Sequence, residues 1–402
     1  MTHEGRHVPV AVKVLHPAIR QSIEADLFLL RSAAQAVESI GGALLQLLEQ
    51  LLQLSAGPRA LHPSYPLVCV SVRESMEQFS SLLRSQLDLQ GEGAALERLH
   101  DNFKSSRHVV VPTPWLLYRD EATDEVIALN TAVTRSCPNT TLPDADLLSR
   151  CTPLRHPDML IETLEEGVPM LEVLRGSASS SASHDNRFIA GLGLDIILKM
   201  VFEDNFVHAD LHAGNILVRY DPPVGADQLS SSAAIQQQQQ HPNLVLLDAG
   251  LVVQLQPHDK KNFVSLFKAV LDNDGREAAR LMMEHMSNVS STAPNSDQTA
   301  MQMVADPEGF QDKMAALISD VHRKGLLLSN VSVGSLLKQV LQNCYEHHVR
   351  LESRYVSIVL SIILAEGMGR QLDPDINIIE RARPFIIRAA MEFIMSRNDL
   401  HR

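Results

Sequence analysis

Apolar residues recur at three- and four-residue intervals along much of the chain, which is the spacing of amphipathic helices. Over residues 19–54 this pattern predicts helix, and the pair Gly41–Gly42 predicts a break into two helices. Leucines mark the expected core face there: Leu27, Leu30, Leu44, Leu48, Leu51 and Leu52. The same spacing predicts further helices at 72–86, 92–103, 188–203, 260–271, 276–286, 312–324, 333–347 and 354–370.

Short runs of β-branched and aliphatic residues predict strands between these helices. The predicted strands lie at 10–14, 109–111, 115–118, 159–162, 216–218 and 244–247. Polar segments rich in Ser, Gly or Pro predict connections at 58–66, 176–184 and 287–297. A Ser- and Gln-rich insert at about 221–243 is poor in apolar residues and is expected to be disordered.

Composition and charge narrow the class of protein. Of the 402 residues 45% are hydrophobic, enough to bury a sizeable core. The 35 basic and 48 acidic residues give a net charge of −13, which argues against nucleic-acid binding. The four cysteines form no CxxC pair, so neither a zinc site nor a disulfide framework is expected. No targeting segment is recognised from residue 1 onward, and the longest apolar run, Tyr355–Ala365, is too short to span a bilayer.

The most informative feature is a pair of short polar motifs, each joined to a predicted strand. Asn215 follows Asp210 by five residues, and Asp248 and Gly250 come directly after an apolar run. Phosphoryl transfer needs a carboxylate that orients the acceptor, and hard oxygen ligands for Mg²⁺. Asp210 can supply the first, and Asn215 with Asp248 the second. Gly250 is expected to let the backbone turn sharply behind the metal ligand.

Two plainer interpretations of these motifs remain open. Polar turns could cap core strands, with His208 and His212 as packed histidines. Alternatively the two histidines could belong to a metal site, although no third soft ligand lies nearby in the sequence. A strand lysine upstream favours the phosphotransfer interpretation, because Lys13 in the run Val10–Val14 matches the pattern whose lysine pairs with nucleotide phosphates.

Taken together, these three segments and two further ones resemble one protein family. The segments are VAVKVLHPAIRQSIEADL, QLDLQGEGAALERLHDNF, FVHADLHAGNILV, LLDAGLV and EGMGRQLDP. They resemble the UbiB, or aarF-domain-containing, family of atypical kinase-like proteins, and the resemblance extends from about Val10 to about Pro374.

The resemblance assigns roles that spacing alone does not give. It makes Lys13 the phosphate lysine, Glu92 its ion-pair partner, and Asp88 the aspartate of an acidic motif beside the transfer site, with Gln86 in place of that motif's glutamate. Ala249 stands where many kinases carry Phe, so no packing switch is expected there. The remaining family-motif positions are His208, Asp210, Asn215, Asp248 and Gly250.

The resemblance implies an α+β, protein-kinase-like fold with two lobes. Residues 1–165 would form a truncated small lobe with helical insertions, and 166–402 a mainly helical large lobe. It also implies Mg-ATP as cofactor and a mitochondrial role in coenzyme Q (ubiquinone) or lipid metabolism. The implied partners are a nucleotide, coenzyme Q intermediates or other lipids, and a coenzyme Q biosynthetic complex. Backbone groups of residues 162–166 are expected to face the adenine base.

The family places a Lys-x-Gly-Gln helix, an alanine-rich nucleotide loop and two strands before its phosphate lysine, whereas Lys13 has twelve residues before it. The favoured interpretation is a fragment of a longer protein, with an exposed apolar surface around Val10, Val12 and Val14. Two other functions compete with the family interpretation. One is a small-molecule phosphotransferase of the aminoglycoside-kinase type, and the other is a pseudokinase scaffold with impaired nucleotide binding.

Overall fold

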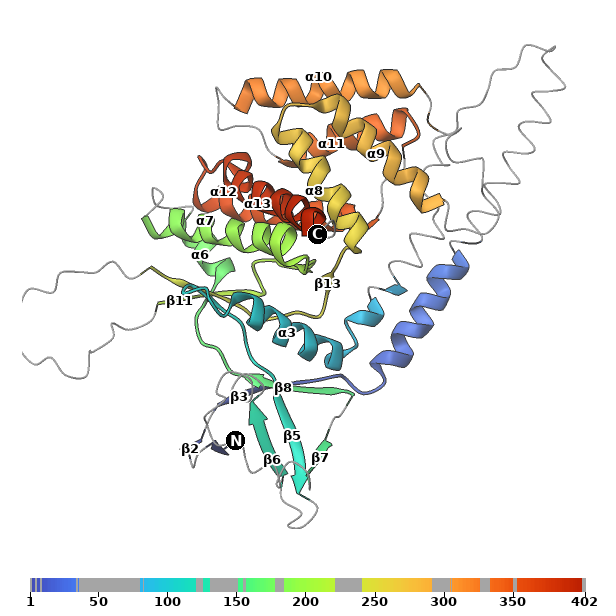
Figure 1. Ribbon diagram of the computed structural model, residues 1–402. Helices are drawn as coiled ribbons and strands as arrows, with labels where there is room; N and C mark the ends of the chain where they lie inside the picture. Colours follow the sequence, from blue (N-terminus) through green and yellow to red (C-terminus); the bar gives the residue numbers. More distant parts are fainter. Residues whose placement is uncertain are drawn as a thin grey trace, which may run out of the picture.

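The protein is described here from a computed structural model. The described residues are 2–3, 6–7, 9–33, 35, 80–81, 83–120, 126–130, 151–154, 157–177, 184–220, 241–290, 304, 306–325, 333–349 and 353–399. Figure 1 shows a lower lobe built on strands and an upper lobe built mostly of helices, so the fold is α+β with two lobes. Several predicted features, including the expected helices over 36–54 and 72–79, lie outside the described residues.

The small lobe is built on two short sheets. Strands β3 (Val10–Val14) and β8 (Met159–Thr163) pair antiparallel. Strands β6 (Val126–Asn130), β5 (Trp115–Asp120) and β7 (Cys151–Leu154) form the second sheet in that order. Residues 19–33 are helical, and β1 (Thr2–His3) pairs with β2 (Arg6–His7). The strands β6 and β7 were not predicted from the sequence.

Strand β3 alternates between an inner and an outer face. Ala11 and Lys13 are half-buried, whereas the side chains of Val12 and Val14 are 52% and 66% exposed. Within the described residues β3 has a single strand neighbour, β8. The expectation of exposed apolar residues is therefore confirmed at Val12 and Val14, while Val10 is half-buried.

Helix α3 (Leu89–Phe103) lies between the two lobes (Figure 1). The side chain of Asp88 caps the helix by accepting a hydrogen bond from the backbone N–H of Gly91. Apolar residues then recur along one face and join the same core as the large lobe. These core residues of α3 are Leu89, Ala95, Leu96, Leu99 and Phe103. The helix is thus fixed against the large lobe along its length.

Behind α3 lies a four-stranded sheet that carries the polar motifs. Its order is β4 (Val109–Val110), β12 (Asn243–Leu246), β11 (Ile216–Arg219) and β9 (Val168–Pro169). A separate pair joins β10 (Val207–His208) to β13 (Val252–Val253). Strands β11 and β12 are antiparallel, β12 is buried along its length, and β11 alternates between buried and half-buried residues. Their ends fix the two motif loops.

Helices make up the rest of the large lobe, and their bounds are as follows. They are α6 (Met170–Ser177), α7 (His184–Leu198), a π-helical turn η2 (Lys199–Asp204), α8 (Pro257–Leu271), α9 (Gly275–Ser290), α10 (Pro307–Gly325), α11 (Val333–Glu346), α12 (Ser353–Leu372) and α13 (Ile378–Asp399). One buried cluster joins α3, the four-stranded sheet, α7, α12 and α13, and a second joins α8 to α11.

Several boundaries differ from the sequence-based predictions. Helices α6 and α13 were not predicted, and Pro384 inside α13 is a residue that normally argues against helix. The predicted helix 188–203 begins earlier, at His184, and ends in the π-helical turn. The insert expected to reach residue 243 ends sooner, because Asn243 already begins β12 and lies opposite Arg219.

One described helix, Arg354–Leu372 within α12, is long and apolar enough to cross a membrane by length and composition. The apolar run Tyr355–Ala365, which was judged too short to span a bilayer, lies within this longer helix. The core of a soluble protein also contains such helices, and 44% of the apolar window is buried. Ile358, Ile362 and Ala365 of this helix belong to the main core.

Two glycines test how tightly the large-lobe helices pack. A Cβ at Gly275 would lie 2.5 Å from the backbone Cα of Ala315 and 2.6 Å from the carbonyl oxygen of Met314, whereas a Cβ at Gly367 would meet nothing within 4 Å. We expect Gly275→Ala to reduce the free energy of unfolding by about 1–3 kcal/mol through overpacking. The control Gly367→Ala, in exposed helix, should raise it by about 0.5–1 kcal/mol. Denaturant unfolding measures both, and equal effects would contradict close packing of α9 on α10.

Candidate functional site

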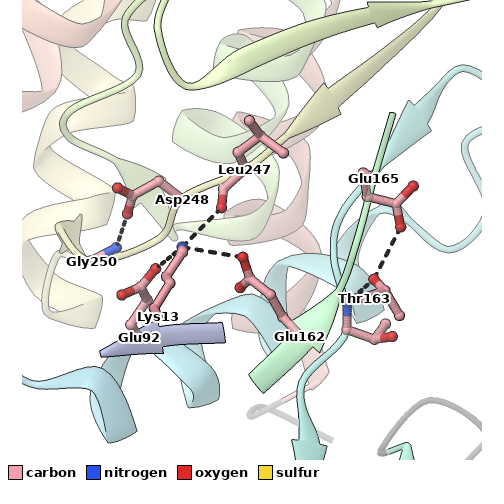
Figure 2. A network of polar contacts seen from close by, with 9 residues as sticks. Lys13, Glu92, Glu162, Thr163, Glu165, Leu247, Asp248 and Gly250 are labelled. Atoms are coloured by element: carbon pink, nitrogen blue, oxygen red, sulfur yellow. Dashed lines mark hydrogen bonds and ion pairs between the residues drawn. The ribbon is translucent and has the colours of Figure 1, made fainter. Parts of the chain in front are cut away.

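The centre of the site is the ammonium of Lys13, which is surrounded by acceptors from three different elements (Figure 2). Its Nζ lies 2.5 Å from Oε1 of Glu92, 3.2 Å from the carbonyl oxygen of Leu247, and 3.4 Å from Oε1 of Glu162. The expected ion pair between Lys13 and Glu92 is thus present, across 79 residues of sequence. The lysine also joins β3 to the residue just before Asp248.

Helix α3 begins at Leu89, before the predicted start at residue 92, and this places Glu92 in the first turn, within reach of Lys13. With Asp88 as the N-terminal cap, Glu92 lies in the first turn and its backbone N–H bonds to the carbonyl oxygen of Asp88. The first turn of a helix favours a negative charge, which suits a carboxylate at this position. The side chain is only 7% exposed, so its charge needs the partner that Lys13 provides.

Glu162 is a residue of the site that sequence reasoning missed. Only its backbone was expected to take part, yet its side chain is 5% exposed and points toward Lys13 (Figure 2). The strand register explains this, because Glu162 lies opposite Ala11 and therefore on the same face as Lys13. The other carboxylate oxygen, Oε2, is buried without a hydrogen-bond partner. The sequence did contain one signal for this role, since Glu162 is a single acidic residue near the end of the otherwise apolar run of β8.

The charges of the cluster shift one another's titration. Burial raises the pKa of Glu162 to about 7, and the charges of Glu92 and Asp248 add to this effect while Lys13 opposes it. Burial alone would lower the pKa of Lys13, but its hydrogen bond to Glu92 and the charges of Glu162, Glu92 and Asp248 raise it. Lys13 therefore carries a positive charge beside three acids throughout the physiological range.

The loop 208–215 holds its two polar side chains through local hydrogen bonds. Asp210 donates its backbone N–H to Nδ1 of His208 at 3.1 Å, and Nδ2 of Asn215 donates to the carbonyl oxygen of Asp210 at 3.3 Å. His208 is fully buried, and burial lowers its pKa, so the ring is neutral. His208 is thus a packed residue, as one interpretation expected. Its ring also accepts the hydrogen bond that holds the loop with Asp210 and Asn215.

The second motif lies directly beside the first. Leu247 donates its backbone N–H to the carbonyl oxygen of Asn215 at 3.0 Å, which joins the two loops. Oδ1 of Asp248 accepts the backbone N–H of Gly250 at 2.6 Å. A Cβ at Gly250 would lie 3.2 Å from that same oxygen. The backbone bends at Gly250, as predicted, without entering the left-handed region, and the close approach of Asp248 also favours a residue without a side chain here.

The side chains present fit a magnesium ion held together with a nucleotide. Oδ2 of Asp248 is not used by Gly250, and the amide of Asn215 turns its nitrogen toward Asp210, which leaves its oxygen free. No group of three or more His, Cys, Asp or Glu among the described residues could hold a metal alone. Mg²⁺ commonly binds through one or two carboxylates plus phosphate oxygens, and this donor set suits that mode.

Asp88 does not share the contacts that unite the other predicted site residues. Its carboxylate is exposed and caps α3 through the N–H of Gly91 at 3.0 Å, and Gln86 is exposed as well. The structure thus shows a capping contact for Asp88 and gives no contact between it and the cluster around Lys13 within the described chain.

The segment after β8 connects the lobes through side chains. Thr163 accepts the backbone N–H of Thr113 at 3.1 Å and donates its hydroxyl to Glu165 at 3.0 Å. Glu165 also pairs with Arg219 of β11 at 2.8 Å. This chain of contacts, part of which is drawn in Figure 2, links the strand that carries Glu162 to the sheet that carries the motifs.

Comparison with known proteins identifies related sequences over most of the chain. The family model described as ABC1 atypical kinase-like domain matches residues 1–282, and the one described as UbiB helical domain matches 315–377. The chain is 28% identical to a mitochondrial ABC1 family protein of Schizosaccharomyces pombe, over 95% of this chain and 47% of that protein. It is 27% identical to the protein named "Probable protein kinase UbiB" of Xanthomonas campestris, over 96% of this chain and 53% of that protein.

A solved structure of Mycobacterium tuberculosis, the complex of Rv3197 with erythromycin, matches with a TM-score of 0.38 and 14% identity. That match covers 91% of this chain and 71% of the solved chain. The chain spans about half the length of the curated relatives that it matches.

The raised pKa of Glu162 gives stability a specific pH dependence. Between the ordinary pKa of 4.5 and about 7, the folded state keeps a proton that the unfolded state loses. Stability should therefore fall as pH rises through this window and remain lower above it. We expect Glu162→Gln to remove this loss, which is on the order of 3 kcal/mol. Urea unfolding of both proteins between pH 4.5 and 8 measures it, and parallel curves would show that Glu162 titrates normally.

Proposed function

The chain belongs to the ABC1 (UbiB) family of atypical kinase-like proteins, and we propose that it is a Mg-ATP-dependent phosphotransferase or ATPase. The observation that carries the proposal is the ion pair of Lys13 with Glu92, at 2.5 Å, beside the loop that presents Asp248. Kinase-type sites require this pair and a metal-binding aspartate to be in place together. Here the backbone of Leu247 joins the two, because it accepts a hydrogen bond from Lys13.

Each residue has a part in the proposed reaction. Bound Mg-ATP would supply the transferable phosphoryl group and the charge neutralisation of the metal. Lys13 holds the nucleotide phosphates, and Asp248 and Asn215 offer oxygen ligands to Mg²⁺. Asp210 orients the acceptor and takes its proton, which is the step that general-base catalysis assigns to a loop carboxylate. The acceptor is a hydroxyl group or, for ATP hydrolysis, water.

The proposed setting is mitochondrial, with a role in coenzyme Q (ubiquinone) or lipid metabolism. The name of the Schizosaccharomyces pombe relative places that protein in mitochondria, and this supports the proposed location. Coenzyme Q intermediates or other lipids, and a coenzyme Q biosynthetic complex, are the proposed partners beside the nucleotide. The name UbiB, given to the Xanthomonas relative, supports this assignment at the level of the family.

Asp248→Asn tests the metal site. Replacing the carboxylate removes a charged Mg²⁺ ligand, so affinity for Mg-ATP should fall by about 10–100-fold, the size of effect seen when metal-site residues are altered. Calorimetry with ATP, with and without Mg²⁺, measures this. Asp375→Asn, an exposed aspartate before α13, is the control and should bind as the unchanged protein does. Equal Mg-ATP affinity in the two variants would contradict the assignment of Asp248.

Asp210→Asn separates catalysis from binding. The variant should keep its nucleotide affinity but lose about 10²–10⁴-fold in turnover, since it retains the loop hydrogen bonds and lacks only a proton acceptor. The loop bonds that persist are made by the backbone of residue 210. Phosphate release and nucleotide affinity are measured on the same preparations. If the unchanged protein binds Mg-ATP but releases phosphate no faster than Asp210→Asn does, the site is not catalytic. The protein would then be a scaffold of the pseudokinase kind.

A further inference from the structure

Two of the three N–H bonds of the Lys13 ammonium are donated, one to Glu92 and one to the carbonyl oxygen of Leu247. The remaining anionic neighbour is Glu162, whose Oε1 lies at ion-pair distance, 3.4 Å from Nζ. A nucleotide phosphate that binds the same lysine therefore competes with Glu162 for its charge. The proposed function thus implies an exchange of partners at Lys13.

Glu162 is the partner that phosphate displaces most readily. Its Oε1 is the most distant of the three acceptors, at 3.4 Å compared with 2.5 Å for Glu92. An arriving phosphate is an anion, so it repels the carboxylate of Glu162 but has little effect on the neutral carbonyl of Leu247. Glu92 holds the shorter and stronger bond and remains in place.

Displacement leaves Glu162 in a poor position for a negative charge. The residue is 3% exposed, and its Oε2 already lacks a hydrogen-bond partner. The ionisable groups that act on it are Lys13 from β3, Glu92 from α3 and Asp248 from the loop after β12. Once Lys13 is paired with phosphate, the remaining ionisable neighbours of Glu162 are the acids Glu92 and Asp248. A buried carboxylate without a cation is neutralised by taking a proton.

We propose that nucleotide phosphate replaces Glu162 as a partner of Lys13, and that this exchange is coupled to the uptake of one proton by Glu162. This inference rests on the proposed function, since it concerns the same nucleotide site. The pKa of Glu162, which burial raises to about 7 beside Lys13, supports it. Glu162 is then largely ionised at pH 8, and losing Lys13 as its partner removes the group that keeps this pKa from rising further.

Calorimetry of Mg-ATP binding in two buffers with different ionisation enthalpies counts the protons. At pH 8 and saturating Mg²⁺, the unchanged protein should take up close to one proton per nucleotide, about 0.9 from a starting pKa of 7. At pH 6 uptake should be much smaller, because Glu162 is already protonated before binding. Above pH 8 the affinity should fall by up to about tenfold per pH unit.

Glu162→Gln supplies the decisive comparison. It should bind Mg-ATP more tightly than the unchanged protein at pH 8, with no proton uptake and a nearly flat pH profile. Glu165→Gln, three residues further along, alters a carboxylate that pairs with Arg219 rather than with Lys13, so it should retain the proton uptake. If Glu162→Gln does not fold, the proton counts of the unchanged protein at pH 6 and pH 8 decide the question.

The possible outcomes separate this inference from the function on which it rests. Binding of Mg-ATP with the same proton count at pH 6 and pH 8 would overturn the exchange and leave the proposed function intact. Weaker binding by Glu162→Gln, without a change in proton count, would show that Glu162 supports Lys13 in the bound state, which also overturns it. Failure of all three proteins to bind Mg-ATP at millimolar concentration would overturn both proposals.

Discussion

The charge of Lys13 constrains more of this molecule than any other single group. Its ammonium is the only cation within a cluster that contains Glu92, Glu162 and Asp248 among the described residues. For this lysine to be satisfied, β3 must pair with β8 in one register, α3 must begin at residue 89, and the loop after β12 must approach β3. Each requirement concerns a different segment, and the lysine is the point at which they meet.

Helix α3 transmits this constraint to the large lobe. Its apolar face belongs to the same core as β11, β12 and α7, so Glu92 cannot move without disturbing that core. On another side, Arg98 lies 4.2 Å from the ring centroid of Phe206 and bonds to Gln254. These two residues continue β10 and β13 at the same end of the pair. Glu92 and the loop that bears Asp210 are therefore positioned by the same packed core.

Local motifs could be predicted from the sequence, and pairings between distant segments could not. Asp210, Asn215 and Asp248 were identified because their spacing and flanking strands lie within short windows, and the loops do hold them together. The partnership of Lys13 with Glu92 came only from family resemblance, since 79 residues separate them. Glu162 was missed because its direction depends on strand register, which a one-residue shift would reverse. The place of Asp88 beside the transfer site was likewise assigned from family resemblance, and the contact that the structure shows for it is a helix cap.

The same distinction between local patterns and distant pairings explains which helices could be predicted. Predicted helices with a regular apolar face were mostly present, but α13 contains Pro384 and the end of α7 passes into a π-helical turn, and neither feature follows from periodicity. A long-range charge pair accompanies the first feature, since Arg381 of α13 bonds to Asp195 of α7 at 2.7 and 2.8 Å. A local pair accompanies the second, since Lys199 bonds to Asp204, five residues later, at 2.6 Å within the π-helical turn. Where long-range charge pairs decide the local structure, as they do at Lys13, the chain must be folded before its pattern can be interpreted.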